Sequence, residues 1–278
     1  MNINNSKFGI KFCLWAAVIL TVCGYAPRGI TGTLSIETKT SVSVTDDRIS
    51  ITVTATNRGT ETAHDVQIHL IFPDHHLKGR ITPLLKPGES GTDNFTKTLS
   101  NIRKGRYPLT VQVDFHDSNN YPFSALSGRT FFFREDVSSD VGVLSKNTAI
   151  TGKGKISFAL TNLGDQPKKI QATLILPKEL STPNTVKMLD IAARSKTNVL
   201  FPISSFSELK ASYPVFCYFE YNLGDFHYTT VSRSVVSIEK PKNWFRRTRL
   251  LWIALGCIMA GGFVILLIKN RKTGATSS

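Results

Sequence analysis

The chain has 278 residues and a formal net charge of +14, a balance that in a folded domain would suggest nucleic-acid binding. The basic excess is concentrated in the two tails, residues 1–26 and 240–278, which contain no acidic residue and hold ten lysines and arginines. Basic residues beside hydrophobic segments are typical of proteins that contact anionic lipid. The charge distribution therefore excludes a nucleic-acid partner and indicates a lipid bilayer.

The cysteines argue against a disulfide-stabilised fold. Of the four, only Cys217 lies outside the hydrophobic segments, which contain Cys13, Cys23 and Cys257. Extracellular Ig domains of eukaryotes usually carry an internal disulfide, so this distribution favours a prokaryotic cell-envelope protein. Cys217 shares one strand face with Val215 and Phe219, which predicts a buried structural thiol in preference to an intermolecular bridge.

The N-terminal segment 1–26 begins with polar residues and continues with an apolar run at 12–23. A run of this length is typical of a signal-peptide core and short for a spanning helix. Small residues within 24–26 favour cleavage there, although Pro27 fits poorly after a cut. An uncleaved N-terminal anchor and a lipoprotein signal at 20–23 stay open as alternatives, and all three export the middle of the chain.

The first half of the chain contains the pattern of two antiparallel strands joined by a turn. Apolar residues alternate with polar ones from Ile49 to Thr56 and again from Val66 to Phe72. A period of two places one apolar row on one sheet face. Asn57 and Gly59 interrupt the alternation, and because both residue types tolerate a positive φ, we expect them to form a tight reversal. Pro73 ends the second strand because it has no N–H to donate.

The same pattern returns about one domain length later. The Asn-x-Gly turn at 57–59 returns at 162–164 with an offset of 105 residues, and the strand at 107–115 returns at 213–221 with an offset of 106. A near-constant offset at two separate motifs indicates a tandem duplication. Turn residues between short alternating strands are typical of a β-sandwich.

We therefore predict an all-β fold with two tandem Ig-like β-sandwich domains, followed by one transmembrane α-helix. The predicted boundaries are 31–135 for the first sandwich, 136–146 for a linker and 147–239 for the second sandwich. So short a linker predicts that the two sandwiches stack end to end as a rod with limited bending.

The C-terminal part is predicted to cross the membrane. Residues 240–249 are a basic juxtamembrane segment, residues 250–268 are uncharged and apolar, and residues 269–278 are a cytoplasmic tail. A helix over 250–268 is about 28 Å long at 1.5 Å per residue, enough to cross the hydrocarbon core. Aromatic and arginine side chains suit the headgroup level. We expect the following side chains at the membrane surface: Trp244, Phe245, Arg246, Arg247 and Arg249.

Within the predicted transmembrane helix, Gly256 and Ala260 form a small-xxx-small pair. Such a pair lets two spanning helices approach closely, so helix pairing is one expectation. The simpler interpretation is that small residues are common in spanning helices, and both interpretations stay open.

The turn and strand motifs resemble those of CARDB and NEW3-type Ig-like modules of bacteria and archaea. The resemblance covers residues 31–135 well and 147–239 more loosely. It implies a seven-stranded sandwich that serves as an adhesion, spacer or carbohydrate-associated accessory module on surface proteins. Because the motif residues are turn and core residues, they specify a fold and not a ligand. These residues are Asn57, Gly59, Pro73, Leu85–Glu89, Gly105, Tyr107, Val111, Val113 and Phe115.

The sequence contains no motif with catalytic or metal-ligand spacing. Asp74, His75 and His76 are adjacent, so neighbours among them would point to opposite faces of a strand, and a loop after the strand end is the simpler interpretation. Asp114 and Glu220 occupy matching positions in the two repeats, where we expect both to face solvent in separate domains. We therefore expect no enzymatic activity, no cofactor and no metal.

These observations predict a non-enzymatic, single-pass protein of the cell membrane, with the sandwiches on the periplasmic or extracellular side and the C-terminus in the cytoplasm. The tandem domains are expected to bind or position an envelope protein partner as an accessory or scaffold subunit. The alternative is a cell-surface carbohydrate-binding module for polysaccharide, which needs a platform of exposed aromatic rings. The candidates for this platform are Tyr121, Phe123, Phe226 and Tyr228.

Overall fold

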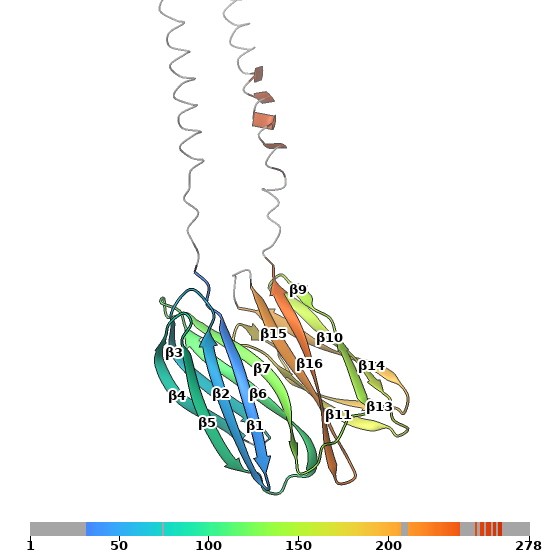
Figure 1. Cartoon of the computed structure of the whole chain (residues 1–278). Coiled ribbons are helices and arrows are strands. Elements are labelled where there is room, and N and C mark those ends of the chain that lie inside the picture. Colours follow the sequence, from blue (N-terminus) through green and yellow to red (C-terminus); the bar gives the residue numbers. More distant parts are fainter. Residues whose placement is uncertain are drawn as a thin grey trace, which may run out of the picture.

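The computed structural model describes residues 32–73, 75–206 and 211–239, together with isolated positions between 248 and 262. Residues 32–239 form an all-β structure of two sandwiches, which confirms the predicted fold class for this part of the chain (Figure 1). The strands of the first sandwich are β1 (Ile36–Thr45), β2 (Arg48–Asn57), β3 (Ala63–Phe72), β4 (His75–Leu85), β5 (Ser90–Thr98), β6 (Lys104–His116) and β7 (Pro122–Phe133).

The first sandwich packs a three-stranded sheet, β1-β2-β5, against a four-stranded sheet, β7-β6-β3-β4. These seven strands are the number that the resemblance to Ig-like modules implies. The alternation in β2 predicted its core face correctly, since the core includes Ile49, Ile51, Val53 and Ala55. Each large apolar side chain buried in this way contributes about 1.5–3 kcal/mol to folding.

The second sandwich repeats this plan with more short strands. Its smaller sheet has the order β12-β14-β10-β8, and its larger sheet has the order β13-β11-β15-β16, with β9 paired to β16. Its core is separate from the first and centres on the rings of Phe158, Phe201 and Phe219. The strands are β8 (Val141–Ser145), β9 (Thr148–Ile150), β10 (Lys153–Asn162), β11 (Lys168–Ile175), β12 (Leu180–Ser181), β13 (Val186–Ile191), β14 (Lys196–Ser205), β15 (Ser212–Leu223) and β16 (Phe226–Ile238).

The Asn-x-Gly motif has a different role from the tight reversal predicted for it. Neither Asn57 nor Gly59 has a positive φ. The buried Asn57 side chain instead donates from Nδ2 to the carbonyl oxygens of Glu61 (2.7 Å) and Leu85 (2.9 Å), and its Oδ1 accepts from the N–H of Gly59 (2.9 Å). The amide therefore satisfies backbone groups that folding removes from water. Gly59 is required by close approach, because a Cβ would lie 2.2 Å from the carbonyl oxygen of Thr33.

The second repeat makes the same connections around a buried Asn162. Its Nδ2 donates to the carbonyl oxygens of Gln166 (2.8 Å) and Ala192 (3.0 Å), and its Oδ1 accepts from the N–H of Gly164 (3.1 Å). A repeated set of three hydrogen bonds around a buried asparagine, together with the matching strand order, is the structural counterpart of the sequence duplication.

The two sandwiches lie side by side, which corrects the predicted end-to-end rod (Figure 1). The strand β16 is the counterpart of β7 in the second repeat. The strand β7 pairs with β6 in antiparallel orientation, whereas the start of β16 pairs with β6 in parallel. The second sandwich is therefore inverted relative to the first. The predicted linker 136–146 is also partly wrong, because β8 at Val141–Ser145 is a strand of the second sandwich and pairs with β10. The connection between the two sandwiches is therefore only the short segment between β7 and β8, and it is not a spacer between two stacked domains.

Candidate functional site: the interface between the sandwiches

The outer faces of the two larger sheets meet, and β15 provides the largest side chains of this interface. Its run from Val215 to Phe219 is buried at every position, so both faces of the strand are covered. Phe216 and Tyr218 are buried but belong to neither sandwich core, since they point to the opposite face from Val215 and Cys217. They are covered by the first sandwich. The uninterrupted apolar run from Val215 to Phe219 is the sequence signal for this two-sided burial, which the alternation of residues does not reveal.

The first sandwich accommodates these rings with small and polar residues. A Cβ on Gly128 would lie 2.6 Å from the ring of Phe216, so only glycine leaves room there. The Tyr218 hydroxyl donates to the carbonyl oxygen of Leu109 (2.8 Å) and accepts from the buried Thr110 hydroxyl (3.0 Å). Burial raises the pKa of Tyr218 to about 12, so its hydroxyl stays a donor throughout the physiological range.

One end of the interface is closed by charged residues. The Asp114 carboxylate on β6 contacts Lys178 Nζ of the second sandwich (2.8 Å) and His69 Nε2 on β3 (3.2 Å). Next to it, the buried Glu179 carboxylate accepts from the N–H (3.1 Å) and the hydroxyl (3.2 Å) of Ser124. Burial, and secondarily the charge of Asp114, raise the pKa of Glu179, while burial lowers the pKa of His69. Asp114 is thus an interface residue and not the solvated outer-face residue that was predicted.

The other end is held by aromatic stacking and by backbone approach. The His227 ring stacks on the Tyr107 ring at 4.3 Å with an interplanar angle of 7°. Its Nε2 lies 3.2 Å from Glu220 Oε1, and its Nδ1 lies 2.9 Å from Asn222 Oδ1. Gly105, with φ at +132°, pairs with His227, and a Cβ there would lie 2.0 Å from the His227 carbonyl oxygen. Glu220 therefore also lies at the interface, contrary to its predicted solvated position.

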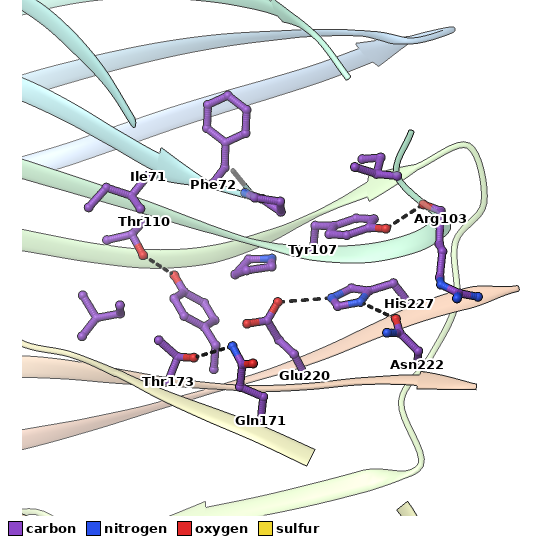
Figure 2. Close-up of a pocket in the computed structure, with 15 residues that line it drawn as sticks. Ile71, Phe72, Arg103, Tyr107, Thr110, Gln171, Thr173, Glu220, Asn222 and His227 are labelled. Atoms are coloured by element: carbon purple, nitrogen blue, oxygen red, sulfur yellow. Dashed lines mark hydrogen bonds and ion pairs between the residues drawn. The ribbon is translucent and has the colours of Figure 1, made fainter. Parts of the chain in front are cut away.

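A cavity of about 430 Å³ remains between the two sheets, near the His227 end (Figure 2). Figure 2 shows Ile71 and Thr110 on the side of the first sandwich and Gln171 and Glu220 on the side of the second. Glu220 is the one carboxylate among the described residues that line the cavity, and these residues include no serine or cysteine. This set can donate and accept hydrogen bonds, but it lacks the activated nucleophile or paired carboxylates of a hydrolase.

The four aromatic residues predicted as a glycan platform are not brought together. Tyr121 and Phe123 lie beside the His116 end of β6, whereas Phe226 pairs with Lys104 at the opposite end of the same strand. Phe123 stacks on Phe115 at 5.9 Å and Tyr228 stacks on Tyr221 at 4.9 Å, so two of the four rings pack against the cores. Tyr121 alone is largely exposed, at 68 %.

The residues predicted at the membrane surface, Trp244, Phe245, Arg246, Arg247 and Arg249, lie outside the described residues, as do Ala260 and segments 1–26 and 269–278. Gly256 is helical, and in the described part of the chain no atom outside its own helical backbone lies within 4 Å of the position of its missing Cβ.

No helix in the described part of the chain is both long enough and apolar enough to cross a membrane.

Other histidines and acidic residues, and Cys217, lie at the following positions. His64 and His116 are paired across β3 and β6, and His116 Nδ1 lies 4.0 Å from Asp65 Oδ2. His75 and His76 begin β4, and Asp74 lies outside the described residues. Among the residues that the structure describes, no group of three His, Cys, Asp or Glu side chains has the arrangement of a metal site. Cys217 is buried as predicted, and burial raises its thiol pKa far above the usual range.

The comparisons with known proteins agree with the fold of the first sandwich. Residues 32–120 match the CARDB family model. The match covers 89 of the 278 residues, and this part of the chain is similar to a CARDB domain. No curated protein matches the sequence.

Solved structures show a weak likeness. Salmonella alpha-2-macroglobulin reacted with methylamine has a TM-score of 0.32 at 10 % identity, with 74 % of this chain and 16 % of that chain covered. Red sea bream transglutaminase has a TM-score of 0.27 at 13 % identity, covering 80 % and 33 %. A Porphyromonas gingivalis W83 protein of unknown function has a TM-score of 0.31 at 12 % identity, covering 73 % and 99 %. The chain thus spans about a sixth of the macroglobulin's length, and scores this low support no conclusion about function.

Proposed function

We propose that the chain is a membrane-anchored, non-enzymatic scaffold or accessory subunit, whose two locked sandwiches bind or position a partner protein outside the membrane. The supporting observation is the position of the chain ends. Because the second sandwich is inverted, the start of β1 and the end of β16 lie at the same end of the domain pair (Figure 1). Both apolar segments of the sequence, 12–23 and 250–268, are therefore attached to one end.

The interface supports a positioning role over a flexible spacer. Buried aromatic packing at Phe216, the hydrogen bonds of Tyr218 and the contact of Lys178 with Asp114 fix the orientation of one sandwich against the other. A fixed pair of sandwiches presents its edge strands at set positions, and edge strands are a common means of binding an extended partner segment. The edge strands β4 and β13 expose apolar side chains that suit such contacts: Ile81, Leu84, Val186 and Met188.

Membrane topology is tested by adding protease to intact spheroplasts that express the full chain with a C-terminal tag. We expect cleavage of the sandwiches and survival of the tag until the membrane is lysed. A tag that is removed from intact spheroplasts, or sandwiches that resist protease until lysis, contradict the proposed topology.

Partner binding is tested by placing a photo-crosslinking residue at Met188 on β13 in the full chain. We expect a discrete crosslinked product in membranes. The substitution Val186→Lys should abolish this product, because a charge on the same edge strand disfavours an apolar contact. The matched control is Thr54→Lys on β2, which is not at this edge and leaves the product unchanged. A product that survives Val186→Lys assigns the contact elsewhere and contradicts the use of this edge.

A second candidate function, glycan binding, is favoured by one observation. The cavity between the sandwiches is lined by the amides of Gln171 and Asn222 and the carboxylate of Glu220, beside the ring of Tyr107. Amides, carboxylates and an aromatic ring are groups that hydrogen-bond and stack with sugars. Glycan-array binding that is lost on Glu220→Gln and kept on Tyr121→Ala favours the cavity, whereas binding that survives Glu220→Gln contradicts it.

A further inference from the structure

Two exposed aromatic rings lie at the end of the domain pair from which both chain ends emerge. Tyr121 is 68 % exposed and Phe206 is 75 % exposed. The Tyr121 N–H donates to Asp117 Oδ1 (2.8 Å), and the Phe206 N–H donates to the carbonyl oxygen of Glu179 (3.1 Å). The backbone at both positions is therefore tied to the sandwiches, and the two rings project from fixed points.

The two rings belong to one surface, because both flank the contact between Ser124 and Glu179. Ser124 lies three residues after Tyr121 and donates hydrogen bonds to the Glu179 carboxylate. The Phe206 N–H donates to the backbone carbonyl oxygen of the same Glu179. Tyr121 comes from the first sandwich and Phe206 from the second. We call this end, with Tyr121, Phe206 and the adjoining chain ends at Gly32 and Glu239, the termini face.

The length of chain outside the sandwiches holds this face near a bilayer. Ten residues, 240–249, separate Glu239 from the apolar segment 250–268. Fully extended, ten residues span at most about 35 Å, and any less extended path is shorter. Under the proposed function, the termini face is therefore the part of the sandwiches nearest to the membrane surface.

The side-chain chemistry suits lipid headgroups. Tyrosine combines an apolar ring with a hydroxyl, and aromatic residues are enriched where one end of a side chain is apolar and the other is wet. We propose that the termini face rests on the lipid headgroups, with Tyr121 and Phe206 inserted at the interface, and that this contact sets the orientation of both sandwiches. The proposal rests on the proposed function, because it requires the chain to be anchored in a membrane.

Hydroxyl-radical footprinting of the full chain in lipid nanodiscs tests the proposal. The reference is Phe132, a 39 % exposed ring that lies near the opposite end of the domain pair, at the end of β7. Relative to Phe132, we expect Tyr121 and Phe206 to be oxidised about fivefold more slowly in nanodiscs than after the sandwiches are released by protease, because rings at the headgroup level are shielded from bulk water. The nanodiscs are made with phosphatidylcholine alone and with added phosphatidylglycerol, and equal protection in both is the expected result.

Three outcomes overturn the proposal. Unprotected rings in both lipids exclude insertion, and protection in phosphatidylglycerol alone assigns the contact to basic residues. Protection in a complex with a protein but not in pure-lipid nanodiscs assigns the face to a protein partner. A failure of the proposed function is distinguishable, because the protein would then not float with vesicles in a density gradient. Flotation with unprotected rings rejects this inference alone.

Discussion

The two repeats share their inward-facing residues and differ in their outward-facing ones. On β6 and β15, the inward rows Tyr107 to Phe115 and Tyr213 to Tyr221 are buried in the same way. The outward rows are different: β6 presents Thr110, Gln112 and Asp114 where β15 presents Phe216, Tyr218 and Glu220. Small and polar residues on one copy receive large rings from the other. Inward residues therefore maintain the sandwich, and outward residues decide how the two copies are joined. Tyr107 is an exception, because its ring belongs to the core and also stacks on His227 at the interface.

The same comparison explains one glycine. Gly105 precedes Tyr107 in the first repeat, and Ala211 stands at the matching position before Tyr213 in the second. Only Gly105 is approached by a backbone from the other sandwich, since it pairs with His227. The difference between glycine and alanine at this position thus reflects the asymmetry of the interface.

The largest effect is expected from the features that the repeats share. Asn57→Ala removes the three hydrogen bonds of a buried amide, so we expect the first sandwich to lose about 3 kcal/mol of its free energy of unfolding. Asn162→Ala should do the same to the second sandwich. Hydrogen exchange followed by mass spectrometry reads each sandwich separately. Thr52→Ala, at an exposed hydroxyl on β2, is the control and should have little effect. If Asn57→Ala also had little effect, this would contradict the structural role of the amide.

A smaller effect, confined to the interface, is expected from Gly105→Ala. The new Cβ meets the His227 carbonyl, and the positive φ alone costs about 1–3 kcal/mol. We expect the sandwiches to separate, which small-angle X-ray scattering would record as a larger radius of gyration, while both cores stay protected from hydrogen exchange. Ala211→Gly is the matched control, with unchanged dimensions. An unchanged radius for Gly105→Ala would contradict the observed pairing of β6 with β16.

Tyr218→Phe tests the hydrogen bonds across the interface. Loss of the hydroxyl leaves the buried carbonyl oxygen of Leu109 and the Thr110 hydroxyl without this partner, so we expect a loss of about 1–2 kcal/mol in the closed arrangement. Urea denaturation combined with scattering measures it. Tyr121→Phe, at an exposed ring, should be neutral, and equal effects of the two variants would remove the special role of Tyr218.

The smallest effect is a pH dependence from Glu179. Its pKa is raised in the folded state, so between the unfolded and folded pKa values the folded protein binds more protons than the unfolded chain. Stability from this group is therefore fully present below the unfolded pKa of about 4.5 and falls as pH rises through the folded pKa. As the pH falls from 7, we expect the free energy of unfolding of the wild type to rise relative to that of Glu179→Gln.

The contribution of His69 to stability changes with pH in the opposite direction, so it has to be separated from that of Glu179. Its pKa is lowered by burial, so its contribution is present above about pH 6.5 and is lost as pH falls through the folded pKa. Subtracting the Glu179→Gln profile from wild type cancels this shared contribution. A flat difference profile would contradict the burial of the Glu179 carboxylate.

Much of the fold was determined by the sequence itself. The alternation in 49–56 identified the core face of β2, and the near-constant offset between the repeats predicted two related sandwiches. The turn residues were less informative, because an asparagine is suited to two different roles. It can adopt a positive φ in a tight turn or, as Asn57 does, form hydrogen bonds with three backbone groups. Local patterns report burial and period, and they do not report which distant backbone groups a side chain reaches.

Only the tertiary structure decided how the two copies are joined. Asp114 and Glu220 looked like solvated outer-face residues, because a strand's alternation separates core from non-core faces but cannot say what covers the second face. The inverted second sandwich is joined to the first where the Phe216 and Tyr218 rings fit against Gly128 and Thr110. That fit depends on contacts about 90 to 110 residues apart in the chain, which no local pattern encodes.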